Sequence, residues 1–327
     1  MIVTRTPVRI SLGGGGTDLP AYYSKYGGSL VSAAIDKYIY IMVNRRFENS
    51  IRIGYSKTEI VHNVEDIEHP IVREAMKLVG VDGGIEIVSI ADVPSNTGLG
   101  TSSSFTVGLL KALHHFKREI LPNHVLAEEA CRIEMDMLGE PIGKQDQYMG
   151  ALGGITALEI DRNGKVSAES LTFTNHTMDE LESNTLLFYT GVRRSASEVL
   201  KDQSSALHED HDGVTEAMHT IKEIGLAIRA ALERGDIHAF GELLDAHWKT
   251  KKQLSSKVTF GKVDEWYDLA KKNGALGGKL MGAGGGGFFM FYCDNNKNRL
   301  RDAMAAEGLV EMRFKIDPEG SKVVMNF

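Results

Sequence analysis

Residues 94–104 read PSNTGLGTSSS, two glycines set among serines and threonines. The segment before them, residues 85–90, is rich in isoleucine and valine, and after them Phe105, Leu109 and Leu113 recur at helical spacing. This pattern predicts a strand, a loop and a helix in that order. Glycines let the backbone approach an anion, and the first N–H groups of a helix point outward without partners. The loop is therefore a candidate phosphate site in which a hydroxyl could also reach a bound metal ion.

A simpler interpretation of this loop stays open. A glycine-rich turn that leads into a helix with a serine N-cap has a similar sequence. The P-loop pattern, in which Gly-Lys-Ser/Thr follows a glycine after four residues, is absent, and so is the dinucleotide pattern Gly-x-Gly-x-x-Gly. If the loop binds a nucleotide, it does so by another scheme.

Glycines are concentrated at three places in the chain. The sequence has 35 glycines, and they cluster at residues 13–16, at Gly98 and Gly100, and at residues 282–287. Each cluster exposes backbone to close approach by another group. Three such loops in one chain need a common explanation.

The chain length of 327 residues fits two domains. No apolar periodicity marks residues 174–184, so we predict an N-terminal domain over residues 1–175 and a C-terminal domain over residues 176–327. Expected strands cover residues 2–5, 9–12, 30–34, 38–43, 51–53, 85–90, 186–189, 288–292, 312–316 and 322–325. Helical patterns cover residues 105–116, 123–138, 195–252, 263–272 and 299–306, and a hairpin turn is expected at 161–164.

Charge and hydropathy exclude several classes of partner. The net charge of −7 argues against nucleic acid or an anionic membrane surface as the main partner. No stretch approaches the roughly 18 apolar residues of a membrane span, and residues 1–5 lack the features of a signal peptide. We therefore expect a cytoplasmic protein. Cys131 and Cys293 have no spacing that suits zinc, and both are expected to be buried and reduced.

Glu134 is a carboxylate on an apolar helix face. It falls on the stripe formed by Leu126, Ala130, Ile133 and Met137. A buried carboxylate is costly unless it is paired, so Glu134 should meet a cation, either an arginine in a structural salt bridge or a bound metal.

Asp146 follows Glu134 by twelve residues and comes just after the helix stop at Gly139-Glu140-Pro141. We expect it in a loop. A solvated loop carboxylate is one interpretation. Because a possible metal ligand is near, Asp146 is also a candidate to orient or deprotonate an attacking hydroxyl.

Three segments together resemble the three motifs of the GHMP kinase superfamily, which includes galactokinase, homoserine kinase and mevalonate kinase. Residues 6–18 (TPVRISLGGGGTD) resemble the first motif, residues 94–104 the phosphate motif, and residues 279–287 (KLMGAGGGG) the third. The resemblance spans nearly the whole chain. It implies an α+β, two-domain GHMP kinase fold, with an N-terminal domain like ribosomal protein S5 domain 2 and a ferredoxin-like C-terminal domain.

The resemblance also implies roles for matching residues. Ser102 and Glu134 correspond to the ligands of Mg²⁺ in relatives, Asp146 to the catalytic aspartate, and Arg9 to an arginine near the transferred phosphate. The residues expected to hold ATP are Pro94, Gly98, Leu99, Gly100, Thr101, Ser102, Ser103 and Ser104. Those expected at the substrate are Gly15, Gly16, Thr17, Asp18, Gly284 and Gly285.

One departure bears on the substrate. Galactokinase carries Glu-His before its Thr-Asp, whereas this chain has Gly15 and Gly16 there, so its sugar pocket should be larger or differently filled. The pattern resembles a branch that contains D-glycero-D-manno-heptose 7-phosphate kinases and, more distantly, the kinase part of L-fucokinases. Both phosphorylate the anomeric hydroxyl.

A phosphorylated substrate needs a basic contact away from ATP. Arg193 and Arg194 are adjacent between a predicted strand and helix, and arginine matches phosphate geometry well. We take Arg193 as the contact, with ordinary surface charges as the alternative.

The sequence thus favours an ATP- and Mg²⁺-dependent kinase that phosphorylates O1 of a heptose 7-phosphate, for nucleotide-activated heptose and surface glycan biosynthesis. A kinase of L-fucose, or a galactokinase-like enzyme, is the main alternative. A nonenzymatic sugar or nucleotide sensor on the same fold is the alternative from another class. The groups that hold adenine and the oligomeric state are not indicated.

Overall fold

The structure, a computed structural model, describes residues 1–192, 196–208, 212–255 and 257–327. Arg193 therefore lies outside the described residues. No helix in the described ranges is long and apolar enough to span a membrane.

A long antiparallel pair of strands runs through the molecule. β1 (Ile2–Gly13) pairs with β2 (Gly28–Arg45) along its whole length, from Ile2 opposite Val43 to Gly13 opposite Val31. The sequence patterns predicted four shorter strands here. The structure joins them into two continuous strands. A shift in pairing register between Pro7 and Val8 accommodates the proline, which has no N–H group to donate.

The first sheet has eight strands built around this pair. Its main path is β12-β1-β2-β5-β3-β4, and β6 pairs with β2 and β7. The pairing of β3 with β5 is parallel, and the other pairings are antiparallel. The additional strands are β3 (Ile51–Gly54), β4 (Thr58–Val61), β5 (Ile85–Ala91), β6 (Ile155–Ile160), β7 (Val166–Ser170) and β12 (Lys322–Asn326). β6 and β7 form the hairpin predicted around residues 161–164.

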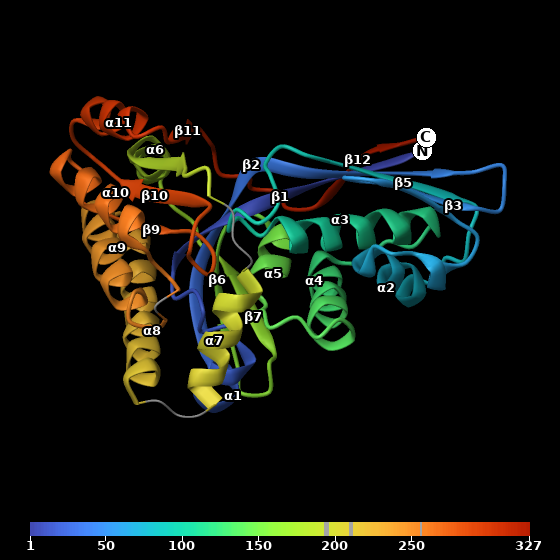
Figure 1. The fold of residues 1–327 in the computed structure, drawn as a ribbon, viewed down its shortest axis with the longest axis horizontal. Coiled ribbons are helices and arrows are strands. Elements are labelled where there is room, and N and C mark those ends of the chain that lie inside the picture. The colour runs from blue at the N-terminus through green and yellow to red at the C-terminus, as the bar shows by residue number, and fades with distance from the viewer. Residues whose placement is uncertain (193–195, 209–211, 256) are drawn as a thin grey trace.

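Helices cover one face of this sheet (Figure 1). α3 (Thr101–Phe116) packs against β1 and β2, and buries Val107, Leu110 and Leu113. The other helical elements of this half are α1 (Pro20–Tyr26), a 3₁₀ turn η1 (Val64–Asp66), α2 (Pro70–Val79), α4 (Asn123–Cys131), a π-helix η2 (Arg132–Met137) and α5 (Gln145–Leu152).

The second sheet is smaller and antiparallel. Its order is β11-β8-β10-β9, from β8 (Thr185–Tyr189), β9 (Gly277–Leu280), β10 (Phe288–Tyr292) and β11 (Val310–Met312). All five residues of the aromatic strand β10 are buried. In the described residues of this half, the helices are α6 (Asn175–Asn184), α7 (Ala196–His208), α8 (Asp212–Glu233), α9 (Ile237–Lys251), α10 (Gly261–Lys272) and α11 (Lys297–Ala306).

The two halves are joined at more than one place. β12, near the C-terminus, pairs with β1, so the termini lie side by side at one end of the first sheet (Figure 1). α8 packs against both β1 and β2. The predicted boundary between residues 175 and 176 falls at the start of α6, and it stays a prediction.

Several local predictions are wrong. Residues 175–184, for which no helix was predicted, form α6; Thr174 caps the helix by accepting a hydrogen bond from the backbone N–H of Thr177. The strand expected at residues 312–316 ends at Met312, and only Ile316 bridges to Ile35. Cys131 and Cys293 are buried and free, as predicted.

Candidate active site

Two of the glycine clusters touch each other. A Cβ added at Gly98, where φ is +79°, would lie 2.4 Å from the carbonyl oxygen of Met281. A Cβ at Gly282 would lie 2.6 Å from the Cα of Gly98. Because neither position leaves room for a side chain, glycine at both allows the loop before α3 to meet the loop after β9.

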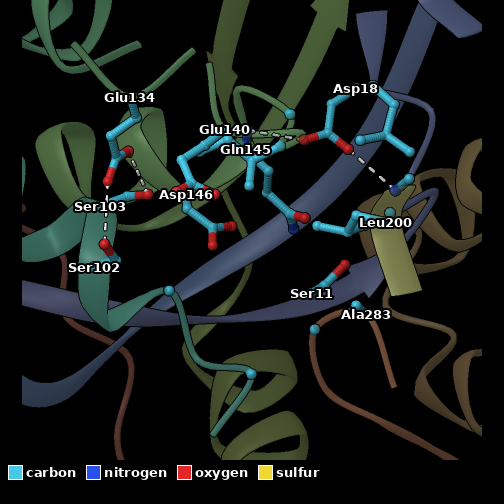
Figure 2. A pocket seen from close by; sticks show the side chains of 18 of the residues that line it. Ser11, Asp18, Ser102, Ser103, Glu134, Glu140, Gln145, Asp146, Leu200 and Ala283 are labelled. Carbon is cyan, nitrogen blue, oxygen red and sulfur yellow. Dashed lines mark hydrogen bonds between the residues drawn. The ribbon is translucent and has the colours of Figure 1, made fainter. Parts of the chain in front are cut away.

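A pocket of about 420 Å³ lies where these loops meet β1. The rest of its wall comes from the loop between β1 and α1, from α2 and η2, from the segment between η2 and α5, and from α5, α7 and α9. Figure 2 shows Asp146 between Glu134 with its serines on one side and Asp18 on the other. A volume of this size suits a small-molecule site.

Glu134 lies at one end of the pocket, with its side chain buried. Its Oε2 accepts hydrogen bonds from Ser103 Oγ at 2.8 Å and from Gln147 Nε2 at 2.5 Å. Its Oε1 accepts from Thr106 Oγ1 at 3.0 Å. Oε1 also accepts, more weakly, from Ser102 Oγ at 3.3 Å (Figure 2). The acidic group is therefore held in place by hydroxyls and an amide.

Of the two cations considered for Glu134, the arginine is not found in the described ranges, where no basic nitrogen lies within ion-pair distance of the carboxylate. Burial is the largest cause that raises the pKa of Glu134 to about 7. Hydrogen bonds from Ser103, Gln147 and Thr106 oppose that rise, and the charge of Asp146 adds to it.

These surroundings fit a magnesium ion. Mg²⁺ prefers hard oxygen ligands and is usually bound by one or two carboxylates together with phosphates of the substrate and water. Glu134 is a buried carboxylate without a described cation, and the Ser102 hydroxyl is 3.3 Å from it on the pocket wall. No group of three or more His, Cys, Asp or Glu side chains suited to a metal is found in the described part of the chain. Phosphates and water would therefore complete the coordination.

The orientation of Glu134 toward the pocket depends on a change of helix type. Leu138 donates to the carbonyl of Ile133, the i to i+5 bond that defines a π-helix. Ile133 and Glu134 remain buried, whereas Met137 is 39% exposed and leaves the predicted apolar stripe. The wider turn of the π-helix explains the exposure of Met137, because it shifts the residues that follow it out of the α-helical spacing.

Arg9 and Asp146 form a two-pronged pair in the middle of the pocket. Arg9 Nε donates to Asp146 Oδ1 at 2.7 Å, and Arg9 Nη2 donates to Oδ2 at 2.8 Å. Arg9 Nη1 also donates to the carbonyl of Gly98. Asp146 lies in the first turn of α5, not in a loop as predicted, and its side chain remains 27% exposed.

Asp18 lies on the side of Asp146 that is opposite Glu134 (Figure 2). Its carboxylate accepts hydrogen bonds from the backbone N–H groups of Gly16 and Gln145, both at 3.0 Å. Burial is the main cause that raises the pKa of Asp18, with a further contribution from the charge of Asp146. Gly143 permits this arrangement, because a Cβ there would lie 2.0 Å from Asp18 Oδ2.

Comparison with known families identifies the chain. The profile of the GHMP kinases N terminal domain matches residues 65–154, and that of GHMP kinases C terminal matches residues 228–309. The D-glycero-alpha-D-manno-heptose 7-phosphate kinase of Campylobacter jejuni is 31% identical to the chain over 98% of both proteins. The chain belongs to the GHMP kinases.

Two further relatives widen the comparison. The L-fucokinase/L-fucose-1-P guanylyltransferase of Bacteroides fragilis is 29% identical over 87% of this GHMP kinase, which spans 34% of that protein. A crystal structure of a D-glycero-D-manno-heptose 1-phosphate kinase from Bacteroides thetaiotaomicron superposes with a TM-score of 0.82 and 26% identity, over the whole of both chains. The predicted GHMP kinase fold is thus confirmed, and so is the predicted class of ATP-dependent phosphotransferase.

The pocket of this GHMP kinase gathers many of the predicted site residues. Those that line it are Arg9, Gly15, Gly16, Asp18, Gly98, Gly100, Thr101, Ser102, Ser103, Glu134 and Asp146. Their individual roles stay predictions, but they come from the first two glycine-rich segments and from the region of residues 134–146.

Other predicted residues do not line the pocket. Thr17 uses its hydroxyl to donate to the carbonyls of Gly14 and Ser29, and Ser104 donates to the carbonyl of Pro7. Leu99 is in the hydrophobic core. The remaining three are Pro94, Gly284 and Gly285. From the third glycine cluster, Gly282 and Ala283 reach the pocket instead.

Several lining residues were not predicted. Ser11 follows Arg9 by two positions on β1, and the alternation of a strand could have indicated that both share a face. Gln145 precedes Asp146. Gln203 on α7 and Lys251 on α9 carry no local sequence signal, because their helices come from the distant second half.

Proposed function

We propose that this GHMP kinase transfers the terminal phosphate of ATP to the anomeric O1 of D-glycero-D-manno-heptose 7-phosphate. The product would be the 1,7-bisphosphate, which would serve the synthesis of nucleotide-activated heptose for surface glycans. The observation that carries this proposal is the full-length similarity to a heptose 7-phosphate kinase, at 31% identity over 98% of both chains. Gly15 and Gly16 also support it, because both line the pocket with backbone alone at the place where galactokinase has two side chains.

The nucleotide phosphates would bind at the start of α3. Loop amides of residues 98–103 and the positive end of the helix dipole would stabilise their charge there. Ser102 and Glu134 would hold Mg²⁺, which neutralises phosphate charge when bound. Pro70, Ile71 and Leu138 add apolar surface to the pocket wall, which suits the flat face of adenine.

Asp146 would orient the acceptor hydroxyl and take its proton. A bond forms between the sugar oxygen and the terminal phosphorus, the bond from that phosphorus to the bridging oxygen breaks, and ADP leaves with the electron pair. Both carboxylate oxygens of Asp146 accept from Arg9, but each retains a lone pair for the hydroxyl. Arg9, beside Gly98, would stabilise charge on the transferred group.

The sugar would occupy the side of the pocket near Asp18. Three buried polar atoms on this wall have no hydrogen-bond partner among the described residues: Ser11 Oγ, Gln145 Nε2 and Gln203 Nε2. Unpaired buried polar groups are unfavourable, so a polyhydroxylated ligand that pairs with them would gain affinity and selectivity.

A coupled ADP-release assay tests the choice of acceptor. The panel is D-galactose, L-fucose, D-mannose, heptose 7-phosphate and heptose 1-phosphate. L-Fucose is included because of the B. fragilis relative, and heptose 1-phosphate because of the B. thetaiotaomicron one. We expect kcat/KM to be highest for heptose 7-phosphate. A preference for any unphosphorylated sugar would rule out the heptose 7-phosphate assignment.

A further inference from the structure

Three basic side chains are buried together beside the pocket. Lys279 on β9 is 1% exposed, Lys251 on α9 is 6% exposed, and His247 on α9 is fully buried. Lys251 and Lys279 line the pocket, whereas His247 does not. The amino groups of two buried lysines therefore belong to a pocket wall that is otherwise protein interior.

The described residues supply no acid for this cluster. No carboxylate in the described ranges lies within 4.0 Å of either lysine nitrogen. Lys251 Nζ donates to the carbonyls of Gly282 and Leu280, and Lys279 has no hydrogen bond with a described residue. His247 adds no negative charge, and neither of its ring nitrogens has a hydrogen-bond partner in that part of the chain.

This cluster is electrostatically unfavourable in the free protein. Burial is the largest cause that lowers the pKa of Lys251, to about 7, and the charge of Arg9 lowers it further. The pKa of Lys279 is lowered well below its usual value by burial, Lys251 and Arg9. Burial and the two lysines likewise lower the pKa of His247. An anion between the lysines would remove the repulsion and favour their charged forms.

The other cation on the described wall is already compensated. Arg9 is paired with Asp146 through two hydrogen bonds. The lysines are thus the described pocket cations that lack a negative partner. A native protein keeps such costly groups where ligand binding requires them.

We propose that Lys279 and Lys251 form a binding site for a phosphate group at the wall of the pocket built by β9 and α9. Two phosphates could occupy it: the one that the acceptor already carries, or the terminal phosphate of ATP. We expect the acceptor's own phosphate, because the nucleotide phosphates have the α3 loop and the magnesium site. The choice of the acceptor's phosphate as the occupant rests on the proposed function, whereas the phosphate site itself does not.

Lys279→Met tests the site, because methionine is similar in length and removes the charge. Titration calorimetry would compare heptose 7-phosphate with the same heptose without phosphate, and the ATP analogue AMPPNP with ADP. We expect heptose 7-phosphate to lose about ten-fold or more in affinity, as for a lost charge-assisted hydrogen bond, and Lys279→Arg to recover part of it. Lys272→Met, an exposed change on α10 with the same loss of charge, is the matched control and should bind like wild type.

Thermal unfolding separates this role from a structural one. An unpaired buried ammonium can be replaced by an apolar group without loss of stability, so ligand-free Lys279→Met should unfold at a higher temperature than wild type. A lysine kept for structure would give a lower temperature. The free variant should therefore be more stable but bind phosphate less well.

The outcomes distinguish this inference from the proposed function. If Lys279→Met lost affinity for AMPPNP alone, the terminal phosphate of ATP would bind at the lysines. The phosphate site would then be supported, with ATP instead of the acceptor as its occupant. Equal affinities of Lys279→Met and wild type for all four ligands would overturn the site. Turnover of heptose 7-phosphate by the wild-type enzyme tests the proposed function separately.

A measurement on the unmodified protein covers the case in which Lys279→Met does not fold. With ¹³C-labelled lysine, the Cε signals of two lysines should titrate at unusually low pH in the free protein. Heptose 7-phosphate or AMPPNP should raise both midpoints. Lysine signals unchanged by either ligand would overturn the site.

Discussion

Arg9 and Asp146 are in direct contact within the pocket as a bidentate pair, with N–O distances of 2.7 and 2.8 Å. Arg9 comes from the first strand and Asp146 from the first turn of α5. In the proposed mechanism, this pair places a cation for the transferred phosphate next to a carboxylate for the attacking hydroxyl. This arrangement suits phosphoryl transfer, in which the protein contributes mainly positioning and charge stabilisation.

The first prediction concerns this pair. Asp146→Asn and Arg9→Ala should each lower kcat by more than about 100-fold, because in the proposed mechanism each removes a group that acts in the transition state. Steady-state kinetics, with circular dichroism to confirm folding, would measure this. Arg5→Ala is the matched control, since Arg5 lies on the same strand and pairs with Asp317 and Glu319 away from the pocket. Near-normal turnover in either pocket variant would remove that residue from the mechanism.

The double variant of Arg9 and Asp146 adds a second readout. Because the two side chains contact each other, we expect the combined loss in log kcat to be smaller than the sum of the single losses. Strict additivity would show that the two residues act independently.

The second prediction concerns Glu134 and pH. Its folded pKa of about 7 lies above the unfolded value of 4.5. Between these values the folded state binds more protons than the unfolded state, so without metal its contribution to stability falls as pH rises from 4.5 to 7. The full effect is at most about 3 kcal/mol.

Urea unfolding in EDTA at several pH values would measure this effect. Glu134→Gln cannot ionise, so its stability should fall less steeply with pH than that of wild type. Mg²⁺ with AMPPNP should restore wild-type stability at pH 7 and have less effect on the variant. Parallel pH profiles for the two proteins would show that Glu134 is not the group responsible.

The third prediction concerns the contact between glycine loops. Gly98→Ala should destabilise the protein by more than about 2 kcal/mol and raise the KM for ATP, because the new Cβ meets the Met281 carbonyl. Gly139→Ala is the matched control: φ at Gly139 is also positive, at +66°, but no atom lies within 4 Å of the added Cβ. The control therefore carries the backbone strain without the contact. Equal losses of stability would mean that the contact is unimportant.

The fourth prediction concerns the sugar side of the pocket. Gln203→Leu should raise the KM for the acceptor about ten-fold and leave the KM for ATP unchanged, because Gln203 Nε2 is buried on the wall without a described partner. Gln253→Leu, an exposed change on the same half of the chain, is the control. A larger effect on ATP than on the sugar would place Gln203 in the nucleotide site.

Local sequence features predicted the parts of the site that are close in sequence to a glycine motif. The loop at residues 94–104 and the helix after it follow from glycine, hydroxyl and apolar spacing, and both exist as α3 and its preceding turn. The inward position of Glu134 followed from helical periodicity. Its partners did not, because Gln147 belongs to a separate helix.

Features that depend on distant packing could not be predicted in this way. The π-helix at residues 132–137 differs from an α-helix by a shifted hydrogen bond, which has no compositional mark. α5 begins at Gln145 without a side-chain cap, so Asp146 looked like a loop residue. Lys279 lies inside a recognised motif, but its burial depends on α9, and its lack of a partner is a property of the folded chain.

The most direct test of the proposed reaction is ³¹P NMR of wild-type enzyme with Mg²⁺, ATP and heptose 7-phosphate. We expect one new sugar-phosphate signal, split by coupling to the anomeric proton and formed in equal amount with ADP. A new phosphate on any other carbon, or ADP formed without a new sugar phosphate, would contradict transfer to O1.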